Sequence, residues 1–136
     1  MKKRFIFALA AFCLALTPSL SQGTKNSVDL TKMSSTMVYA KVFDMLVNPE
    51  SYEGKQIKMR GTFTVFEYEQ KRVFTCIVQD ATACCAQGLE FRLKDNPKYP
   101  ENYPAPYSEI TVIGTFHQYE ENGLSYILLQ NSRLEP

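Results

Sequence analysis

Several patterns that carry enzyme chemistry are missing from this chain of 136 residues. It contains a single histidine, and it has no C-x-x-C pair, no Gly-rich phosphate loop and no H-E-x-x-H motif. No Ser–His–Asp set is recognisable either, so the sequence offers none of the common signatures of nucleophilic, redox or metalloprotease chemistry. We therefore predict no catalytic residues and a protein that is not an enzyme.

Long apolar runs are also lacking, which bears on any relation to a membrane. The longest run covers residues 5–16 and is too short to span a bilayer. Basic residues precede it at positions 2–4, and the small residues Ser19 and Ser21 follow it. Together these features are typical of a secretory signal peptide over residues 1–21. We predict an exported protein, periplasmic or extracellular, with no transmembrane segment once the signal is removed.

The sequence carries no excess of one charge, since its formal net charge is +1. The predicted signal contains three of the 15 basic residues and no acidic residue, which leaves 12 basic against 14 acidic residues, a net charge of −2. A polyanionic partner needs a surplus of cations. We therefore expect no nucleic-acid partner, and a metal ion or an envelope protein instead.

The chain that remains after the signal divides into an arm and a domain. Residues 22–34 are polar and aperiodic, which indicates a flexible N-terminal arm. Residues 35–136 are predicted to form one domain, which begins with a helix over about residues 37–47. Apolar residues at helical spacing lie on one face of this helix, and Pro49 ends it.

The rest of the domain is patterned for β-strands. Alternating or continuous apolar residues predict five strands, over about residues 55–66, 72–79, 89–94, 110–119 and 124–130. The first and the fourth contain a glycine, Gly61 and Gly114, where a sharp bend is expected. Asn122-Gly123 predicts a tight hairpin between the last two strands. Five short strands must close, or nearly close, to protect their edges.

This order of elements resembles the OB-fold, a five-stranded Greek-key barrel, preceded here by one short α-helix. The resemblance covers about residues 37–134 and implies a mainly β protein. A narrower resemblance rests on a Pro-Glu-x-Tyr-x-Gly-Lys lead-in and on adjacent cysteines after the second strand. It is carried by Pro49, Glu50, Tyr52, Gly54, Lys55, Cys84 and Cys85. In these features the chain looks like uncharacterised exported bacterial proteins, including the C-terminal domain of an uncharacterised predicted two-component permease family. The resemblance implies a fold and supplies no reaction.

The adjacent cysteines at positions 84 and 85 are the most distinctive feature, and four interpretations compete for them. In the first, thiolates hold a soft metal, zinc or copper. The candidate ligands are Cys84, Cys85, Cys76, His117 and Asp80. The histidine belongs to this set because the loops after the second and fourth strands are expected at the same end of a barrel.

The second interpretation is a disulfide among the three cysteines that remain when Cys13 leaves with the signal peptide. A bond from Cys76 to Cys84 or Cys85 would join the second strand to the following loop. A bond between the two neighbours would close a strained ring. The third interpretation is packing, with cysteine as a small apolar residue, and the fourth is thiol redox chemistry. The sequence leaves all four open.

A second candidate site lies on the strands and on the Pro-rich loop. Arg60, Arg72 and Arg92 are expected to project from the first three strands, and Tyr99 and Tyr103 belong to the loop after the third strand. The tyrosines could form a stacking or sugar-binding platform, and the arginines with aromatic residues nearby could resemble a face for single-stranded nucleic acid, against which the export signal and the slightly negative charge argue. Alternatively, the tyrosines pack the loop over an open end of the barrel, and the arginines form an ordinary solvated face.

The preferred prediction is therefore an exported, non-catalytic OB-fold binding module that holds a soft transition metal through the cysteine pair. The alternative is a structural or protein-interaction domain of the cell envelope that a disulfide stabilises. A thiol enzyme is the third hypothesis.

Overall fold

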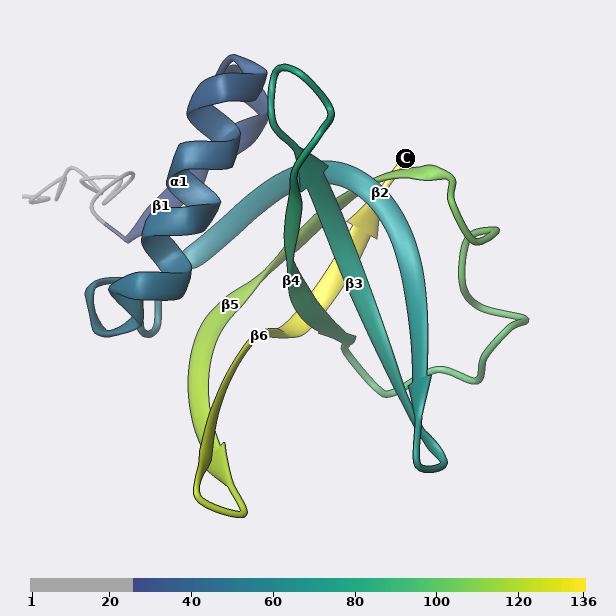
Figure 1. The fold of residues 1–136 in the computed structure, drawn as a ribbon. Coiled ribbons are helices and arrows are strands. Elements are labelled where there is room, and N and C mark those ends of the chain that lie inside the picture. Colours follow the sequence, from purple (N-terminus) through teal and green to yellow (C-terminus); the bar gives the residue numbers. More distant parts are fainter. Residues whose placement is uncertain (1–25) are drawn as a thin grey trace, which may run out of the picture.

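The computed structural model describes residues 26–136, and Figure 1 shows their arrangement. The predicted signal peptide, with Cys13, and the first residues of the predicted arm lie outside the described residues. The described part is mainly β, with one α-helix and a six-stranded mixed sheet. No helix within it has the length and apolar character needed to cross a membrane.

Helix α1 spans Ser35–Val47, close to the predicted range. Asn48 caps its end, and the following proline begins a short 3-10 helix, η2 (Pro49–Ser51). The inner face of α1 carries Val42 and Met45, which are both fully buried. Burial of such side chains contributes about 1.5–3 kcal/mol each, so packing against the sheet holds the helix in place.

The sheet has six strands of very different length. They are β1 (Ser27–Asp29), β2 (Gln56–Tyr68), β3 (Lys71–Gln79), β4 (Ala86–Leu93), β5 (Glu109–Glu121) and β6 (Leu124–Glu135). Their order is β1-β2-β3-β4-β6-β5, and β2 pairs with β5 as well. The pairs β1–β2 and β4–β6 are parallel, and the others are antiparallel. The additional pairing curls the sheet into a partial ring.

The structure differs from the prediction of a five-stranded barrel with a free arm at residues 22–34. It contains a sixth strand, β1, and the 3-10 helix η1 (Leu30–Lys32), both within that arm. β1 pairs in parallel with the start of β2, and Leu30 is 1% exposed. The sequence did not reveal these elements because three residues are too few to display a period.

Gly61 and Gly114 lie within the two long strands, β2 and β5, that bend most strongly in Figure 1. A Cβ atom on Gly61 would clash with the carbonyl oxygen of Ile77 and would lie 2.9 Å from Cys76 Sγ. A Cβ atom on Gly114 would lie 2.8 Å from Leu129 Cβ, and the register between β5 and β6 shifts at this point. Glycine thus lets a neighbouring strand approach closely at each position.

The core fills the inside of the curled sheet and is rich in aromatic rings. Phe63 of β2, Phe91 of β4 and Phe116 of β5 are fully buried. The ring centroids of Phe63 and Phe91 lie 6.0 Å apart, within the range of favourable aromatic pairs. This core fixes the relative positions of the two ends of β3 and β4, where the candidate sites lie.

Candidate functional site

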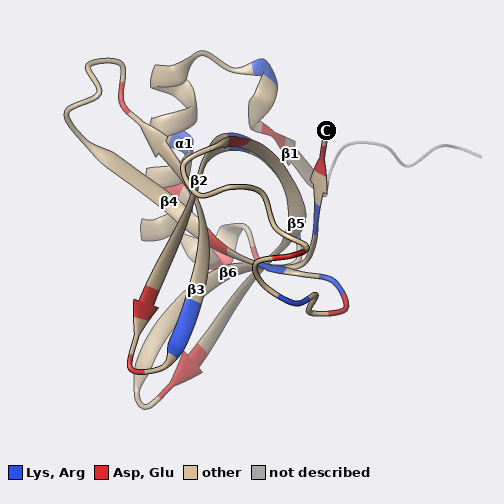
Figure 2. Ribbon diagram, turned by 90° about the vertical axis from the view of Figure 1, so that its right-hand side faces the viewer, with Lys and Arg blue, Asp and Glu red and all other residues tan. Residues whose placement is uncertain are grey.

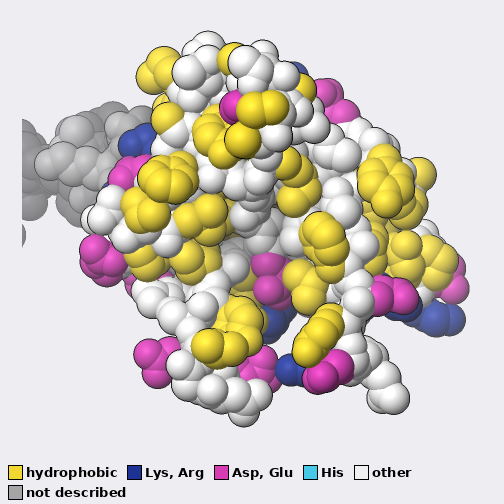
Figure 3. Space-filling model, in the orientation of Figure 1, with side chains coloured by type: hydrophobic (Ala, Val, Ile, Leu, Met, Phe, Trp, Pro, Cys, Tyr) yellow, Lys and Arg dark blue, Asp and Glu magenta, His cyan; other side chains and the backbone are white. Residues whose placement is uncertain are grey.

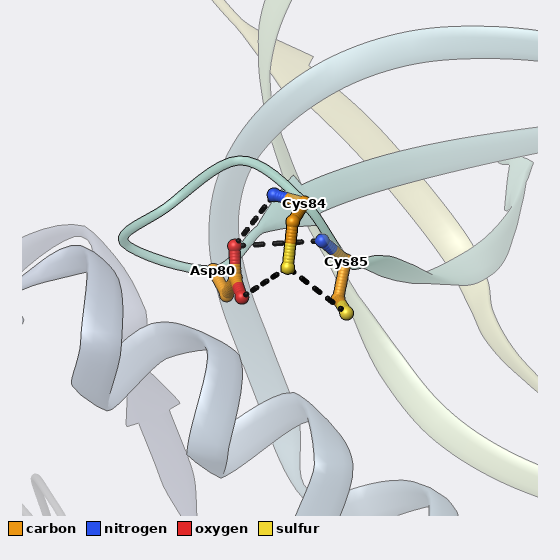
Figure 4. A group of neighbouring side chains, drawn as sticks. All are labelled: Asp80, Cys84 and Cys85. Carbon is orange, nitrogen blue, oxygen red and sulfur yellow. Dashed lines mark hydrogen bonds between the residues drawn. The ribbon is translucent and has the colours of Figure 1, made fainter.

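The β3–β4 connection carries the adjacent cysteines, next to α1 (Figure 4). Its backbone is closed on itself: the Asp80 amide donates to the Cys85 carbonyl at 3.0 Å, and the Ala83 amide donates to the Asp80 carbonyl at 3.1 Å. Ala83 has a φ of +56°, in the left-handed region that residues with a Cβ seldom adopt. This sharp turn brings Cys84 back over Asp80.

The carboxylate of Asp80 organises this loop. Its Oδ1 accepts hydrogen bonds from the Cys84 amide at 3.0 Å and from the Thr82 hydroxyl at 3.1 Å. Desolvation opposes ionisation, but the hydrogen bonds from Thr82 and from the amides of Cys85 and Cys84 outweigh it, so the pKa of Asp80 is lowered. The group is therefore a carboxylate throughout the neutral pH range.

The two thiols lie on the same side of the loop as this carboxylate. Cys84 Sγ is 3.5 Å from Cys85 Sγ and 3.5 Å from Asp80 Oδ2. One ligand atom from each of the three residues lies within 4.8 Å of the others, and both cysteines are exposed. The hydrogen bond with Cys84, then desolvation and the charge of Asp80, raise the pKa of Cys85. A metal bound here would therefore have to displace thiol protons.

The spacing of these donors is close to that around a tetrahedral ion. Two thiolates bound to Zn²⁺ at about 2.3 Å lie about 3.8 Å apart, and a thiolate and a carboxylate oxygen lie about 3.6 Å apart. The observed distances of 3.5 Å, from Cys84 Sγ to Asp80 Oδ2 and to Cys85 Sγ, are close to these ligand-to-ligand distances. The set supplies three donors, so a tetrahedral ion would keep one position open for solvent or another ligand.

Cys76 does not join this cluster, although it was predicted as a ligand. It lies in β3, opposite Phe63 of β2 and Leu89 of β4, and its exposed fraction is 0%. Desolvation raises its pKa to about 12, so it is a neutral thiol at any physiological pH. A thiol in this state behaves as a small apolar core residue, which agrees with the packing interpretation for this cysteine.

The predicted disulfides are not supported. Cys76, Cys84 and Cys85 are all free, and the two neighbouring sulfurs lie 3.5 Å apart, against about 2.05 Å for a bonded pair. The alternation of β3 turns Cys76 into the core, whereas the loop beyond the strand carries the other two thiols into solvent. The fold therefore separates Cys76 from Cys84 and Cys85, the cysteines that the sequence allowed to form a disulfide with it.

His117 lies in a different setting from the cysteine loop. Its Nδ1 is 2.9 Å from Glu53 Oε1, and the other oxygen of Glu53 accepts from the Gln118 amide at 2.8 Å. These bonds lower the pKa of Glu53. Strand register explains the separation: Phe116 is hydrogen-bonded to the chain at the start of β2, whereas the end of β3 lies beside the middle of β2. Among the described residues, the cluster around Asp80 does not include the histidine.

The predicted ligand-face residues gather mainly at the opposite end of β3 and β4. The guanidinium of Arg72 lies 4.6 Å from the centre of the Tyr99 ring. The ring of Tyr103 stacks on Phe74 with centroids 4.2 Å apart. The two tyrosines therefore pack the Pro-rich loop against the sheet, and Tyr103 also lines a hollow between the β2–β3 and β5–β6 hairpins.

The other two predicted ligand-face residues, Arg92 and Arg60, lie in different places. The Arg92 guanidinium lies 5.1 Å from the centre of the Tyr119 ring and donates to its hydroxyl at 3.0 Å, beside the hollow. Arg60 lies elsewhere, in contact with Thr111 of β5 at 3.4 Å. The structure thus brings Arg72, Arg92 and Tyr103 to one hollow and leaves Arg60 outside it.

Sequence reasoning missed two tyrosines at this hollow. Tyr119 and Tyr126 face each other across the β5–β6 hairpin and stack with centroids 5.3 Å apart. The signal that could have found them is the Asn122-Gly123 turn, since a two-residue turn fixes the register and therefore pairs position 119 with position 126.

Tyr39 of α1 was missed at the cysteine loop. Desolvation, followed by the charges of Cys85 and Asp80, raises the pKa of this phenol. Its carbonyl oxygen also accepts a hydrogen bond from the Gln87 side chain of β4. No sequence pattern pointed to this contact, because it joins residues that are far apart along the chain.

Comparisons with known proteins yield a likeness of fold only. No family model and no curated protein matches the chain. A solved structure of a candidate nucleic acid-binding lipoprotein from Klebsiella pneumoniae subsp. pneumoniae MGH 78578 is similar, with a TM-score of 0.50 and 20% identity. The similarity covers 73% of this chain and 88% of that chain. At this identity the likeness concerns the fold and carries no residue role across.

Proposed function

We propose that this protein is an exported, non-catalytic binding module that holds a soft transition metal ion through Asp80, Cys84 and Cys85. The observation that carries the proposal is the convergence of these donors within 4.8 Å of one another on a loop closed by its own backbone. Because the donors are already gathered, little chain ordering would oppose binding.

Zinc is the ion that this donor set favours. Copper(I) selects sulfur ligands, whereas Zn²⁺ accepts thiolates together with a carboxylate oxygen. The carboxylate of Asp80 lies 3.5 Å from Cys84 Sγ and is held ionised by hydrogen bonds. A mixed set of two sulfurs and one oxygen therefore suits zinc better than copper.

We propose further that the curled sheet is an OB-type Greek-key barrel to which β1 has been added. The order β2-β3-β4-β6-β5, with β5 returning to pair with β2, supports this assignment. The assignment of export is supported by the signal-peptide pattern of residues 1–21 and by the similar fold of a protein that is a lipoprotein by name. The fold alone implies no ligand.

The prediction of no nucleic-acid partner is kept as part of the proposal. The neighbour's name concerns that protein, and the cations at the hollow of this chain are engaged by carboxylates. The alternative function, a protein-interaction domain, is supported by one observation: α1 exposes Met37, Phe43 and Val47, each more than half accessible. A disulfide is no longer part of that alternative.

The test of the metal proposal is zinc uptake by the protein, expressed from the full chain and purified reduced and without oxygen. We expect one equivalent of Zn²⁺ in competition with a chromophoric chelator. Cobalt(II) in the same site should give thiolate-to-metal charge-transfer absorption, which reports sulfur ligation directly. Replacing Cys84 or Cys85 by serine should weaken binding by at least about tenfold and remove part of that absorption.

His117→Gln is the matched control, because this residue was predicted as a ligand and lies away from the cluster. It should leave the zinc affinity unchanged. Circular dichroism of each variant checks that the fold is retained. A folded, reduced protein that takes up neither zinc nor copper would overturn the proposal and would favour the interaction-domain alternative.

A further inference from the structure

A second site lies at the end of the β3–β4 pair that is remote from the cysteine loop. It is a hollow of about 650 Å³ between the β2–β3 hairpin and the β5–β6 hairpin. In Figure 3, hydrophobic side chains flank a depression between these two hairpins, and acidic and basic side chains lie within it. The volume falls in the range of about 300–1,000 Å³ that small-molecule sites occupy.

Aromatic rings form opposite parts of the lining of this hollow. On one side, Tyr103 stacks on Phe74 at 4.2 Å, and on the other, Tyr119 and Tyr126 stack at 5.3 Å. All four rings are partly exposed. Rings held by other rings lose little freedom when a ligand stacks on them, so the lining is preorganised.

The cations beside these rings are already neutralised. Arg72 lies 2.8 Å from Glu67, Arg92 lies 3.0 Å from Glu90, and Lys71 lies 3.0 Å from Glu121. Figure 2 shows acidic and basic residues close together at the end of the β2–β3 hairpin and acidic residues at the end of the β5–β6 hairpin. A polyanion is bound by cations that are free to release counterions, and this hollow does not supply them.

The Lys71–Glu121 pair joins the two hairpins across the hollow. Lys71 begins β3 and Glu121 ends β5, 50 positions apart along the chain. Both side chains are about half exposed or more, at 66% and 47%. Such a pair contributes little to stability, so it can open for a ligand without weakening the fold.

From these features we propose that the hollow binds a neutral oligosaccharide. Sugar rings present apolar C–H faces that stack on aromatic rings, and their hydroxyls both donate and accept hydrogen bonds. The paired carboxylates and guanidinium groups, together with the amides of Asn96 and Asn122, supply both kinds of partner with no net charge to satisfy. This inference is independent of the metal site, since it rests on other residues.

The test titrates the protein with three neutral tetrasaccharides, cellotetraose, tetra-N-acetylchitotetraose and maltotetraose, while amide resonances are followed by NMR. We expect at least one to bind with a Kd of about 1 mM or tighter. The shifted amides should belong to the β2–β3 and β5–β6 hairpins and to β4, and those of residues 80–85 should not move.

Tyr126→Ala should weaken this binding by at least about fivefold, the lower end of what loss of a stacking ring costs, whereas Tyr126→Phe should keep it. Tyr107→Ala is the matched control, because this tyrosine is 79% exposed and does not line the hollow. Retained binding in Tyr126→Phe shows that the ring suffices without its hydroxyl, and unchanged amide resonances away from the hollow in Tyr126→Ala separate loss of the ring from loss of the fold.

Three results would overturn the proposal. The first is the absence of binding by all three sugars, and the second is equal weakening by Tyr126→Ala and Tyr107→Ala. The third is tighter binding of a thymidine oligonucleotide of about ten residues than of any sugar, which would make the hollow a stacking site for single-stranded nucleic acid.

Discussion

The two ends of the β3–β4 pair hold their polar groups in different ways. At the loop end, the backbone amides of Cys84 and Cys85 and the Thr82 hydroxyl fix one carboxylate, and two exposed thiols lie beside it, with Cys84 Sγ 3.5 Å from its Oδ2. At the hairpin end, side chains neutralise one another in pairs and rest on aromatic rings. The first arrangement leaves donors available for an ion, whereas the second leaves ring faces and hydrogen-bonding groups for an uncharged ligand.

The largest difference between the two ends is expected in the pH dependence of ligand binding. Zinc binding by two thiols displaces up to two protons, so the apparent affinity should fall by up to about a hundredfold for each pH unit below the thiol pKa values. Because the pKa of Cys85 is raised, the apparent zinc affinity begins to fall at a higher pH. Because the pKa of Asp80 is lowered, its carboxylate stays ionised over this range and does not contribute to the pH dependence. Zinc competition between pH 8 and pH 6 measures it. A flat profile would contradict ligation by thiolates, and sugar binding should not change over this range.

The three thiols should differ widely in reactivity. Burial that raises the pKa of Cys76 from 9.0 to about 12 lowers its thiolate fraction about a thousandfold, before its inaccessibility is counted. Iodoacetamide with mass spectrometry should therefore label Cys84 and Cys85 in the native, reduced, metal-free protein, and Cys76 only after unfolding. Rapid native labelling of Cys76 would show that β3 does not bury it.

Reciprocal variants test whether the two ends are independent. Cys84→Ser combined with Cys85→Ser should abolish zinc uptake and leave sugar binding within about twofold. Tyr126→Ala should weaken sugar binding by at least about fivefold and leave zinc affinity within about twofold, because residues more than about 10 Å apart without shared partners act additively. Paired titrations with zinc and with the best sugar provide the measurement. Loss of both activities in either variant would mean that the sites are coupled or the fold is damaged.

Serine substitutions distinguish the core cysteine from the loop cysteines. Cys76→Ser buries a hydroxyl in an apolar setting and should lower the free energy of unfolding by about 1–3 kcal/mol. Cys84→Ser changes an exposed side chain and should shift the free energy of unfolding of the metal-free protein by less than about 0.5 kcal/mol. Urea denaturation of both variants decides the matter, and equal effects would place the two cysteines in equivalent environments.

The smallest effect is expected from the ion pair that joins the hairpins. Lys71→Ala removes the partner of Glu121 and should change sugar affinity by less than about threefold, since exposed pairs contribute little. Calorimetric titration can resolve such a change. A loss as large as that of Tyr126→Ala would show that the pair itself contacts the ligand.

Local sequence patterns determined the elements of this protein. The 3.6-residue period predicted α1, alternating or continuous apolar residues predicted the five strands β2 to β6, and glycine at positions 61 and 114 marked the bends. They could do so because each period records which face of an element is buried. The sequence did not predict β1, because so short a strand shows no hydrophobic period and its partner in β2 lies 29 positions away along the chain.

Only the tertiary structure decided which side chains meet. The sequence offered five metal ligands, and the fold gathered Asp80, Cys84 and Cys85 while it turned Cys76 into the core and paired the only histidine with Glu53. The loop trio was accessible to prediction because its members are close along the chain. The other outcomes depend on register and on which face of a strand points inward, and these are set by packing between segments that no local pattern relates.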